Sequence, residues 1–356
     1  MRLDKLFKVS FRADASNIIG SGHVIEIISL IRALRERIEF EPVFVTVENA
    51  FTMEKLRENG ISSIICLPGG LQEEAEADLV VRALEDLGCE HLVVDLLHRS
   101  NDFYGYLYSN LKSTCVILDN NEHKEIPASV VVNFSITQDP DFYRKVDQHK
   151  TKYLIGPGYF WFDEVINKIK PVSVVGPKVE RVFVNQGGSD PYGLTVKIIR
   201  ALELGNFEQE FHVVLGGLLQ DEHKFGLEYL RNSLGGNYTF YTDLPKIDLY
   251  HLMEKSDLAI SAAGNTLYEL AYLGVPTLVI SHDHLHDQVA IAFEQKKAVS
   301  NVGVGTKLTD SQIASEFRRL INDAHARLTL SKNARNLFNS GSGTALVDEL
   351  GRLYSR

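Results

Sequence analysis

The chain has 356 residues, of which 44% are apolar and 24% charged, and a formal net charge of −10. This length predicts two folded domains, and the composition is that of a folded protein without disordered or fibrous segments. The negative charge gives no basic field to attract nucleic acid or an anionic membrane. A local cluster of backbone N–H groups could still bind a phosphate.

Three cysteines, Cys66, Cys89 and Cys115, are present and none forms a CxxC pair. They support neither a disulfide framework nor a cysteine zinc site, and all three are expected to fill the core. Charged residues interrupt the N-terminus where a signal peptide would be apolar, and no segment approaches about 18 uncharged apolar residues. We therefore expect a cytoplasmic protein without stable membrane insertion.

The first half alternates short β-branched runs with segments of helical periodicity, which predicts parallel strands joined by crossover helices. The expected strands are Lys8–Arg12, Val43–Val47, Ile61–Cys66, His91–Asp95, Thr114–Asp119 and Val130–Phe134. The expected helices are Gly22–Arg37, Thr52–Asn59, Gln72–Leu87 and Asp102–Leu111. Together these elements predict a doubly wound, Rossmann-like domain over residues 1–155.

Glycine and proline are concentrated between Tyr153 and Lys178, and we place an interdomain linker at residues 156–178. The alternation then restarts and predicts a second doubly wound domain over residues 179–356. Its expected strands are Arg181–Val184, Phe211–Leu215, Tyr238–Thr242, Leu258–Ser261 and Thr277–Ile280. Its expected helices are Tyr192–Leu204, Tyr229–Leu234, Leu249–Lys255 and Leu267–Leu273, with helices filling the chain from Leu285 onward. Because ligands bind outside the carboxyl ends of such strands, we expect the two domains to face each other across a ligand cleft.

The first motif with chemical potential follows the first strand, where Gly20-Ser21-Gly22-His23 opens a helix. The glycines permit a tight turn and close approach of a ligand to the backbone. His23 would lie in the first helical turn, where the helix dipole favours the neutral imidazole that a general base requires. A capping role, in which His23 only hydrogen-bonds its own loop, is an equal alternative. The loop fits the GxGxxG dinucleotide pattern poorly, because position 25 is Ile.

Two strand-to-helix turns in the second half suit a nucleotide. Residues 185–191 read Asn-Gln-Gly-Gly-Ser-Asp-Pro, which combines a turn, an N-cap candidate and a favourable first helical residue. Residues 261–269 place small side chains before a helix, where exposed amides could hold a diphosphate. Glu269 could accept hydrogen bonds from both ribose hydroxyls, although a solvated helix acid is the simpler interpretation of this residue alone.

Two further polar groups follow strands. Residues 281–288 contain three alternating histidines, which we interpret as a polar loop because their spacing matches no compact metal-ligand set. Asp95 and Asp119 each end a strand, and Asn120, Asn121 and His123 follow the second of them. These residues could bind sugar hydroxyls, or the aspartates could cap the next helix.

Taken together, the motifs resemble the UDP-sugar hydrolases of pseudaminic acid biosynthesis and the related spore-coat polysaccharide proteins. The resemblance rests on residues 12–16, 19–24, 187–191, 261–269 and 273–277, with Gly156-Pro157-Gly158-Tyr159 and Asp287-Gln288 in the expected order. It spans both predicted domains and implies the GT-B architecture, similar to that of the transferase that adds N-acetylglucosamine in lipid II synthesis. No metal or other cofactor is implied, and a monomer is expected.

The resemblance also implies a substrate and a site. The substrate would be a UDP-diacetamido-trideoxyhexose, and His23 would be the base for water that attacks the anomeric carbon, with inversion and release of UDP. The implied sugar contacts are Arg12, Asp14, Gly22, Asp95, Asn120 and Tyr159. The implied UDP contacts are Gly188, Ser189, Ala263, Gly264, Asn265, Thr266, Glu269 and Gln288.

The chain departs from the family pattern at two places. Ile25, Glu26 and Ile27 stand where the family has Met, Arg and Cys, and Asp119-Asn120 stands where it has two aspartates. Two alternatives to the hydrolase are therefore kept: a GT-B glycosyltransferase that moves the sugar to an acceptor, and a non-catalytic protein that binds a nucleotide sugar. The first domain has only scattered Lys and Arg, which favours hydrolysis over transfer to a lipid acceptor, whereas Glu26 favours the non-catalytic alternative.

Overall fold

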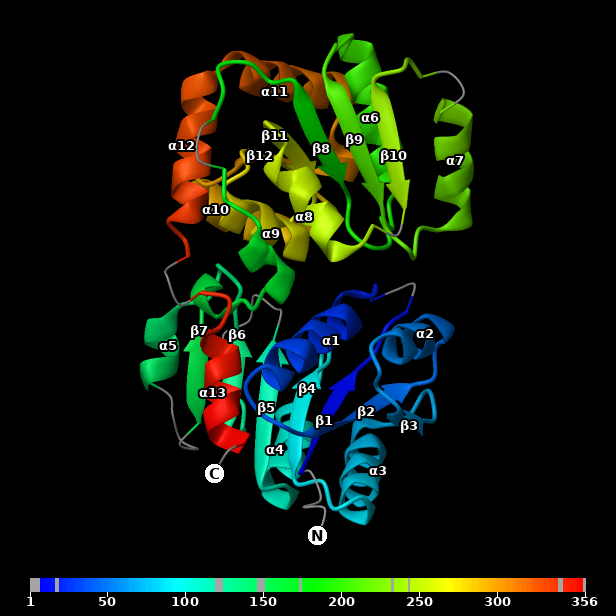
Figure 1. The fold of residues 1–356 in the computed structure, drawn as a ribbon, viewed down its shortest axis with the longest axis vertical. Helices are drawn as coiled ribbons and strands as arrows, with labels where there is room; N and C mark the ends of the chain where they lie inside the picture. The colour runs from blue at the N-terminus through cyan, green and yellow to red at the C-terminus, as the bar shows by residue number, and fades with distance from the viewer. Residues whose placement is uncertain are drawn as a thin grey trace. The chain divides into compact units, whose positions relative to one another are not determined.

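In this computed structural model the chain forms two compact units, Met1–Asp163 together with Gly341–Arg356, and Glu164–Ser340 (Figure 1). The structure describes residues 7–16, 19–118, 124–145, 151–172, 175–231, 234–242, 244–338 and 342–354, without the side chains of residues 167, 221 and 224. Each unit is built on one parallel sheet, so the prediction of two doubly wound α/β domains is confirmed. In the described part of the chain, no helix is long and apolar enough to cross a membrane.

The first sheet has seven strands in the order β3-β2-β1-β4-β5-β6-β7. These are β1 (Lys8–Ala13), β2 (Glu41–Val47), β3 (Ser63–Leu67), β4 (His91–Asp95), β5 (Ser113–Leu118), β6 (Val130–Asn133) and β7 (Lys152–Ile155). The winding direction reverses between β1 and β4, which are hydrogen-bonded neighbours with Ala13 opposite Asp95. This reversal is the topological switch point, where open α/β sheets bind their ligands.

Helices cover both faces of the first sheet (Figure 1). Apolar side chains of α3 (Glu73–Asp86) and α4 (Asn101–Asn110) form a core cluster with one face. The other face packs against α1 (Gly22–Arg35), which also contacts α2 (Ala50–Glu58) and α13 (Ala345–Tyr354). Two short helices, α5 (Pro140–Lys145) and the 3₁₀ helix η1 (Pro157–Tyr159), flank β7.

The C-terminal helix α13 belongs to the first unit, whereas the sequence boundaries assign residues 179–356 to the second domain. Its apolar face is buried through Leu346, Val347, Leu350 and Tyr354. The Tyr354 ring lies 5.0 Å from the ring of His91 in β4. An amphipathic helix goes where its apolar stripe can be buried, and its position along the chain does not reveal which sheet supplies that surface.

The second sheet has six strands in the order β10-β9-β8-β11-β12-β13, with its own switch point between β8 and β11. The strands are β8 (Arg181–Asn185), β9 (Glu210–Leu215), β10 (Tyr238–Thr242), β11 (Leu258–Ser261), β12 (Thr277–Ser281) and β13 (Ser300–Val304). The helices are α6 (Leu194–Gly205), α7 (Asp221–Arg231), α8 (Lys246–Glu254), α9 (Asn265–Leu273), α10 (His284–Gln295), α11 (Asp310–Asn322) and α12 (Ala324–Arg335), with 3₁₀ turns η2 (Glu164–Lys168) and η3 (Gly305–Lys307). Side chains of α6, α7 and α11 share one core cluster with the sheet, and α8, α9 and α10 lie on its other face (Figure 1).

Three expectations from the sequence differ from the structure. Strand β7 lies at the start of the stretch interpreted as turn-rich, and β13 interrupts the region from Leu285 onward that was expected to be helical. Cys66 is exposed on β3, because β3 is the edge strand, whereas Cys89 and Cys115 are buried as expected. The change of unit after Asp163 falls within residues 156–178, where we placed the linker.

Candidate functional site

The switch point of the first unit is formed by the loops that follow β1 and β4. After β1, Ser16 and Gly20 exchange two backbone hydrogen bonds of 3.1 and 2.8 Å. Gly20 has a φ of 78°, a left-handed conformation that glycine adopts without steric cost. This closed turn brings the chain directly into α1, whose first residue is Gly22.

His23, the second residue of α1, is nearly buried, with 8% of its surface exposed. Its Nδ1 lies 2.7 Å from Oδ1 of Asp95, which ends β4 and is 1% exposed. An ionised carboxylate can only accept a hydrogen bond, so the neutral ring carries its proton on Nδ1 and its lone pair on Nε2. The pair therefore has the arrangement of a general base that is oriented by a carboxylate.

Asp95 does not cap the helix that follows it. The N-cap of α4 is Ser100, whose Oγ accepts a hydrogen bond from the N–H of Phe103 at 3.2 Å. Oδ2 of Asp95 is buried and has no hydrogen-bond partner among the described residues. The carboxylate is therefore committed to His23 through one oxygen only.

Arg12 and Asp14 belong to a buried ionic network beside this pair. The Arg12 guanidinium, in a residue that is 1% exposed, contacts Asp14 at 2.5 and 2.7 Å and Glu76 at 2.9 Å, and Arg99 binds the other oxygen of Glu76 at 2.9 Å. Burial alone would raise the pKa of Asp14, but Arg12 and the backbone N–H of Val47 lower it below its usual value. The network connects the loop after β1, the end of β2, helix α3 and the loop after β4, and direct sugar contact by Arg12 would require it to open.

The other predicted sugar contacts are less informative. Gly22 begins α1 and Tyr159 ends η1, where it is partly buried. Asn120, with Asp119, Asn121 and His123, lies outside the described residues. Glu26 follows His23 by three residues on the same helix, and its backbone carbonyl accepts a hydrogen bond from the Trp161 indole at 3.1 Å.

The second unit contains a hollow of about 210 Å³ beside its switch point. It lies at the carboxyl ends of β8 and β9 and is lined by Asn185, Gly187, Gly188, Val214, Leu215, Gly216, Gly217, Leu244, Leu249 and Thr266. A Cβ atom on Gly216 would lie 2.1 Å from the carbonyl oxygen of Gly188, so the two loops meet at a distance that only glycine permits. Two predicted UDP contacts, Gly188 and Thr266, lie on this hollow.

The two helices that begin at this edge differ in their N-terminal caps. Asp190 is 3% exposed, and its carboxylate accepts hydrogen bonds from the N–H groups of Leu194 and Thr195 in α6 at 2.8 and 2.9 Å. The N-terminus of α6 is thus occupied by an internal anion. The N-cap of α9 is Gly264, and no side chain caps this helix. Between the two, α9 is the helix whose N-terminus can receive a phosphate from outside.

The remaining predicted residues of this region lie on or just before α9. Ala263 is buried in the loop between β11 and α9, while Gly264, Asn265 and Thr266 are partly exposed. Ser189 is partly exposed in the turn after β8, and Gln288 is exposed on α10.

Glu269, one turn beyond Thr266 on α9, is 6% exposed. Its Oε1 accepts hydrogen bonds from Nζ of Lys246 at 2.7 Å and from the hydroxyl of Tyr250 at 2.8 Å. Glu269 is therefore a held, buried carboxylate and not the solvated helix acid of the simpler interpretation. Lys246 and Tyr250 were not identified from the sequence, since nothing in their local pattern reveals that α8 packs against α9.

The histidine-rich loop of residues 281–288 makes separate local contacts. His282 Nε2 donates to the carbonyl of Gln186 at 3.1 Å, and burial together with the nearby His286 lowers the pKa of His282. His286 contacts its own helix cap, Asp283, at 2.9 Å. In the part of the chain that the structure describes, no group of three or more His, Cys, Asp or Glu could hold a metal ion.

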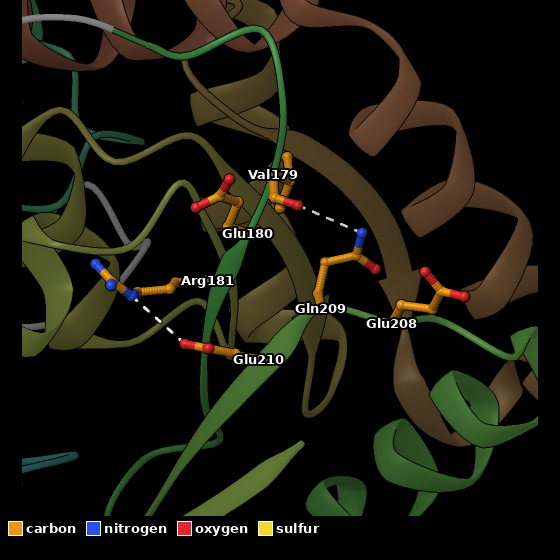
Figure 2. A pocket seen from close by; sticks show the side chains of 6 residues that line it. All are labelled: Val179, Glu180, Arg181, Glu208, Gln209 and Glu210. Atoms are coloured by element: carbon orange, nitrogen blue, oxygen red, sulfur yellow. Dashed lines mark hydrogen bonds and ion pairs between the residues drawn. The ribbon is translucent and has the colours of Figure 1, made fainter. Parts of the chain in front are cut away.

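A larger hollow, of about 330 Å³, lies at the amino ends of the strands of the second sheet (Figure 2). Its residues precede or begin β8 and β9, and they are Val179, Glu180, Arg181, Glu208, Gln209 and Glu210. Nε of Arg181 lies 3.5 Å from Oε2 of Glu210, and a dashed line marks this ion pair in Figure 2. Three glutamates against one paired arginine repel a phosphate, so the smaller, glycine-lined hollow is the better candidate for a nucleotide.

Comparison with known proteins gives distant relatives. No protein-family model matches the chain. It is 23% identical to the spore coat polysaccharide biosynthesis protein SpsG of Bacillus subtilis over 346 residues, which cover 96% of this chain and 98% of SpsG. It is 26% identical over 286 residues to an uncharacterised protein of Methanocaldococcus jannaschii, covering 78% of this chain and 56% of that protein.

A third relative has two activities in its name. Over 223 residues the chain is 25% identical to the pseudaminic acid cytidylyltransferase and UDP-2,4-diacetamido-2,4,6-trideoxy-beta-L-altropyranose hydrolase of Helicobacter pylori. The match covers 62% of this chain and 38% of the Helicobacter protein. The chain thus spans about half or less of two of these three relatives and nearly all of SpsG.

Solved structures share the fold over almost the whole chain. MurG of Acinetobacter baumannii superposes with a TM-score of 0.66 at 13% identity, covering 97% of this chain and 99% of MurG. The UDP-GlcNAc 2-epimerase of Neisseria meningitidis, solved with UDP-GlcNAc bound, gives 0.66 at 14% identity, covering 98% of this chain and 100% of the epimerase. The chain therefore has the GT-B-like architecture of these enzymes and is a distant homologue of SpsG and of the hydrolase-containing protein of Helicobacter pylori.

Proposed function

We propose that this protein hydrolyses a UDP-activated sugar, with His23 as the general base. The observation that carries the proposal is the buried pair of His23 and Asp95 at the switch point of the first sheet. The proposal is supported by distant homology to a protein named as a UDP-sugar hydrolase, and by the GT-B-like fold. By the same homology, the sugar is a diacetamido-trideoxyhexose of nonulosonic acid or surface-polysaccharide biosynthesis.

The chemistry requires one proton transfer and one bond cleavage. The water oxygen attacks the anomeric carbon while Nε2 of His23 accepts a proton from it. The bond between the anomeric carbon and the diphosphate oxygen breaks, and UDP leaves with the bonding electrons. Because water attacks the face opposite UDP, the anomeric centre is inverted. Asp95 stabilises the imidazolium that forms, as a buried carboxylate does when it accepts from the other ring nitrogen. General base catalysis of this kind contributes about 10²–10⁴-fold to the rate.

The second unit supplies the nucleotide site in this proposal. The diphosphate binds at the N-terminus of α9, where backbone N–H groups and the helix dipole stabilise the charge that the leaving group develops. Gly188 and Thr266 line the hollow beside this terminus. The buried carboxylate of Glu269 accepts the ribose hydroxyls. No step of this reaction needs a metal ion.

A glycosyltransferase is the second candidate, because MurG shares the fold and an acceptor hydroxyl attacks the same carbon as water. Release of UDP from UDP-activated amino sugars, measured without any acceptor, separates the two. Turnover comparable with that of a dedicated enzyme supports hydrolysis. Turnover only on addition of an acceptor would replace hydrolysis by transfer, and UDP-sugar binding without turnover would make the protein a binding module.

The base assignment has a matched control within the first unit. His23 and His91 are each 8% exposed, and each has a side-chain partner at Nδ1. His91 starts β4, at the amino ends of the strands, whereas His23 follows β1, at their carboxyl ends. The two histidines therefore lie at opposite ends of neighbouring strands. His23→Asn should lower the rate by about 10²–10⁴-fold with UDP binding retained, whereas His91→Asn should retain activity in its folded fraction. Equal rates in both variants would remove His23 from the mechanism.

A further inference from the structure

The buried carboxylate of Glu269 needs compensation that the fold supplies through two donors on α8. A carboxylate that is 6% exposed is costly unless it is paired and hydrogen-bonded. Lys246 and Tyr250 both reach Oε1, at 2.7 and 2.8 Å. The Lys246 ammonium also lies 5.3 Å from the centroid of the Tyr250 ring, so the three groups form one compact cluster.

This arrangement uses only one side of the carboxylate. Among the residues that the structure describes, none donates a hydrogen bond to Oε2 of Glu269. Tyr250 is fully buried, and the packing around it fixes its side chain. Its hydroxyl therefore holds the Glu269 carboxylate in one orientation. Glu269 follows Thr266 by three residues, which places both on one face of α9, and Thr266 lines the glycine-lined hollow.

Lys246 lies at the junction between this cluster and the hollow. It is the first residue of α8, and its side chain is 34% exposed. Leu244 and Leu249, which flank it in the chain, both line the hollow. Lys246 thus supplies the positive charge beside a buried acid at the border of the proposed nucleotide site.

We propose that Lys246 is a positioning residue for nucleotide recognition: its hydrogen bond holds the Glu269 carboxylate in one orientation, so that the carboxylate selects ribose over deoxyribose. The inference rests on the proposed function, because it takes UDP as the ligand of the second unit. A carboxylate that is fixed before binding forms a hydrogen bond with each ribose hydroxyl, and each bond adds to the binding free energy. Where a hydroxyl is missing, that contribution is lost.

The test compares UDP with 2′-deoxy-UDP by calorimetry on the full chain. The wild-type protein should bind UDP at least roughly 10-fold more tightly than 2′-deoxy-UDP, which is the difference that a hydrogen bond to a charged group provides. Lys246→Met should reduce this ratio to about 2-fold or less while leaving the affinity for 2′-deoxy-UDP unchanged. Lys246→Arg keeps the positive charge and should retain most of the preference for UDP over 2′-deoxy-UDP. Tyr250→Phe should lower this preference although Lys246 is still present. Lys255→Met at the end of the same helix is the control for loss of one cation and should behave as wild type.

Two results would overturn the inference while leaving the proposed function intact. One is a wild-type ratio in Lys246→Met and in Tyr250→Phe. The other is an equal loss of affinity for both nucleotides in Lys246→Met, which would mean that Lys246 contacts the diphosphate or the base. Failure of wild type to bind UDP at all would overturn the nucleotide site, and the inference with it.

Discussion

Replacement of Asp95 by Asn is the sharpest test of the pair at the first switch point. The two side chains have nearly the same volume, but the Asn amide can donate a hydrogen bond to Nδ1 of His23, from which the carboxylate only accepts. Donation to Nδ1 moves the ring proton to Nε2, and that nitrogen can then no longer accept a proton from water. We expect Asp95→Asn to bind UDP as wild type does and to lose most of its hydrolysis.

The structure sets limits on the magnitude. Loss of a charge-assisted hydrogen bond of the length seen here corresponds to about 1.5–3 kcal/mol, or roughly 10–100-fold. The same exchange behind a catalytic histidine in serine proteases lowers kcat by about 10⁴-fold, because the wrong tautomer results. We therefore expect a decrease in kcat between about 10² and 10⁴-fold. Because the Asn amide still forms a hydrogen bond with Nδ1 and Oδ2 of Asp95 has no hydrogen-bond partner to lose in the described structure, the free energy of unfolding should change by no more than about 1 kcal/mol.

The assay is acceptor-free UDP release, with thermal unfolding measured in parallel. Ser113→Ala is the matched control, because Ser113 is the Nδ1 partner of the equally buried His91, at 2.8 Å. It should leave kcat unchanged. A decrease of less than about threefold in Asp95→Asn, against the 10²–10⁴-fold expected of a base, would show that Asp95 does not control the protonation of His23.

Three further predictions concern stability and the nucleotide site. Gly216→Ala should weaken UDP binding and lower the free energy of unfolding by about 1–3 kcal/mol, because its Cβ would lie 2.1 Å from the carbonyl of Gly188; calorimetry and thermal unfolding measure both, with Gly236→Ala as the control. Deletion of residues 342–354 should destabilise the first unit by about 6–12 kcal/mol, since four buried apolar side chains of α13 are lost, and differential scanning calorimetry would detect the lower Tm. The pKa of Asp14 is lowered in the folded state, so its contribution to stability is complete above about pH 4 and is lost as pH falls further; Asp14→Asn should flatten this part of the acid unfolding curve.

Each of these predictions can fail clearly. Wild-type UDP affinity in Gly216→Ala would place the nucleotide away from the β8 and β9 loops. An unchanged Tm after removal of α13 would mean that its buried face adds nothing to the first unit. An acid unfolding curve that is the same with Asn at position 14 would mean that the carboxylate is compensated equally in the unfolded chain.

The sequence predicted most strands of both sheets because these are continuous apolar runs between glycine-rich turns, a local signal. Strand β13 reads Ser-Asn-Val-Gly-Val, which has little strand propensity, and it exists because β12 offers a hydrogen-bonding edge. The pairing of His23 with Asp95 joins residues 72 positions apart. The doubly wound order, which sets β1 beside β4, could have suggested it. The contact of Lys246 with Glu269 could not be foreseen, since it depends on how α8 packs on α9.

The uncapped N-terminus of α9 allows a final test that separates stability from function. Gly264 has a φ of −101°, and a Cβ atom there would meet nothing within 4 Å, so Gly264→Asp is sterically permitted. An aspartate at this N-cap should stabilise the helix by about 0.5–1 kcal/mol through capping and the helix dipole. If α9 holds the diphosphate, the aspartate should lower UDP affinity by more than about 10-fold, because the carboxylate and the diphosphate would repel each other at one helix N-terminus. The N-terminus of α6 is already occupied by a carboxylate in this way, that of Asp190. Gly264→Asn adds the cap without the charge and should lose much less affinity. A stabilised Gly264→Asp variant that binds UDP as wild type does would exclude α9 as the phosphate site.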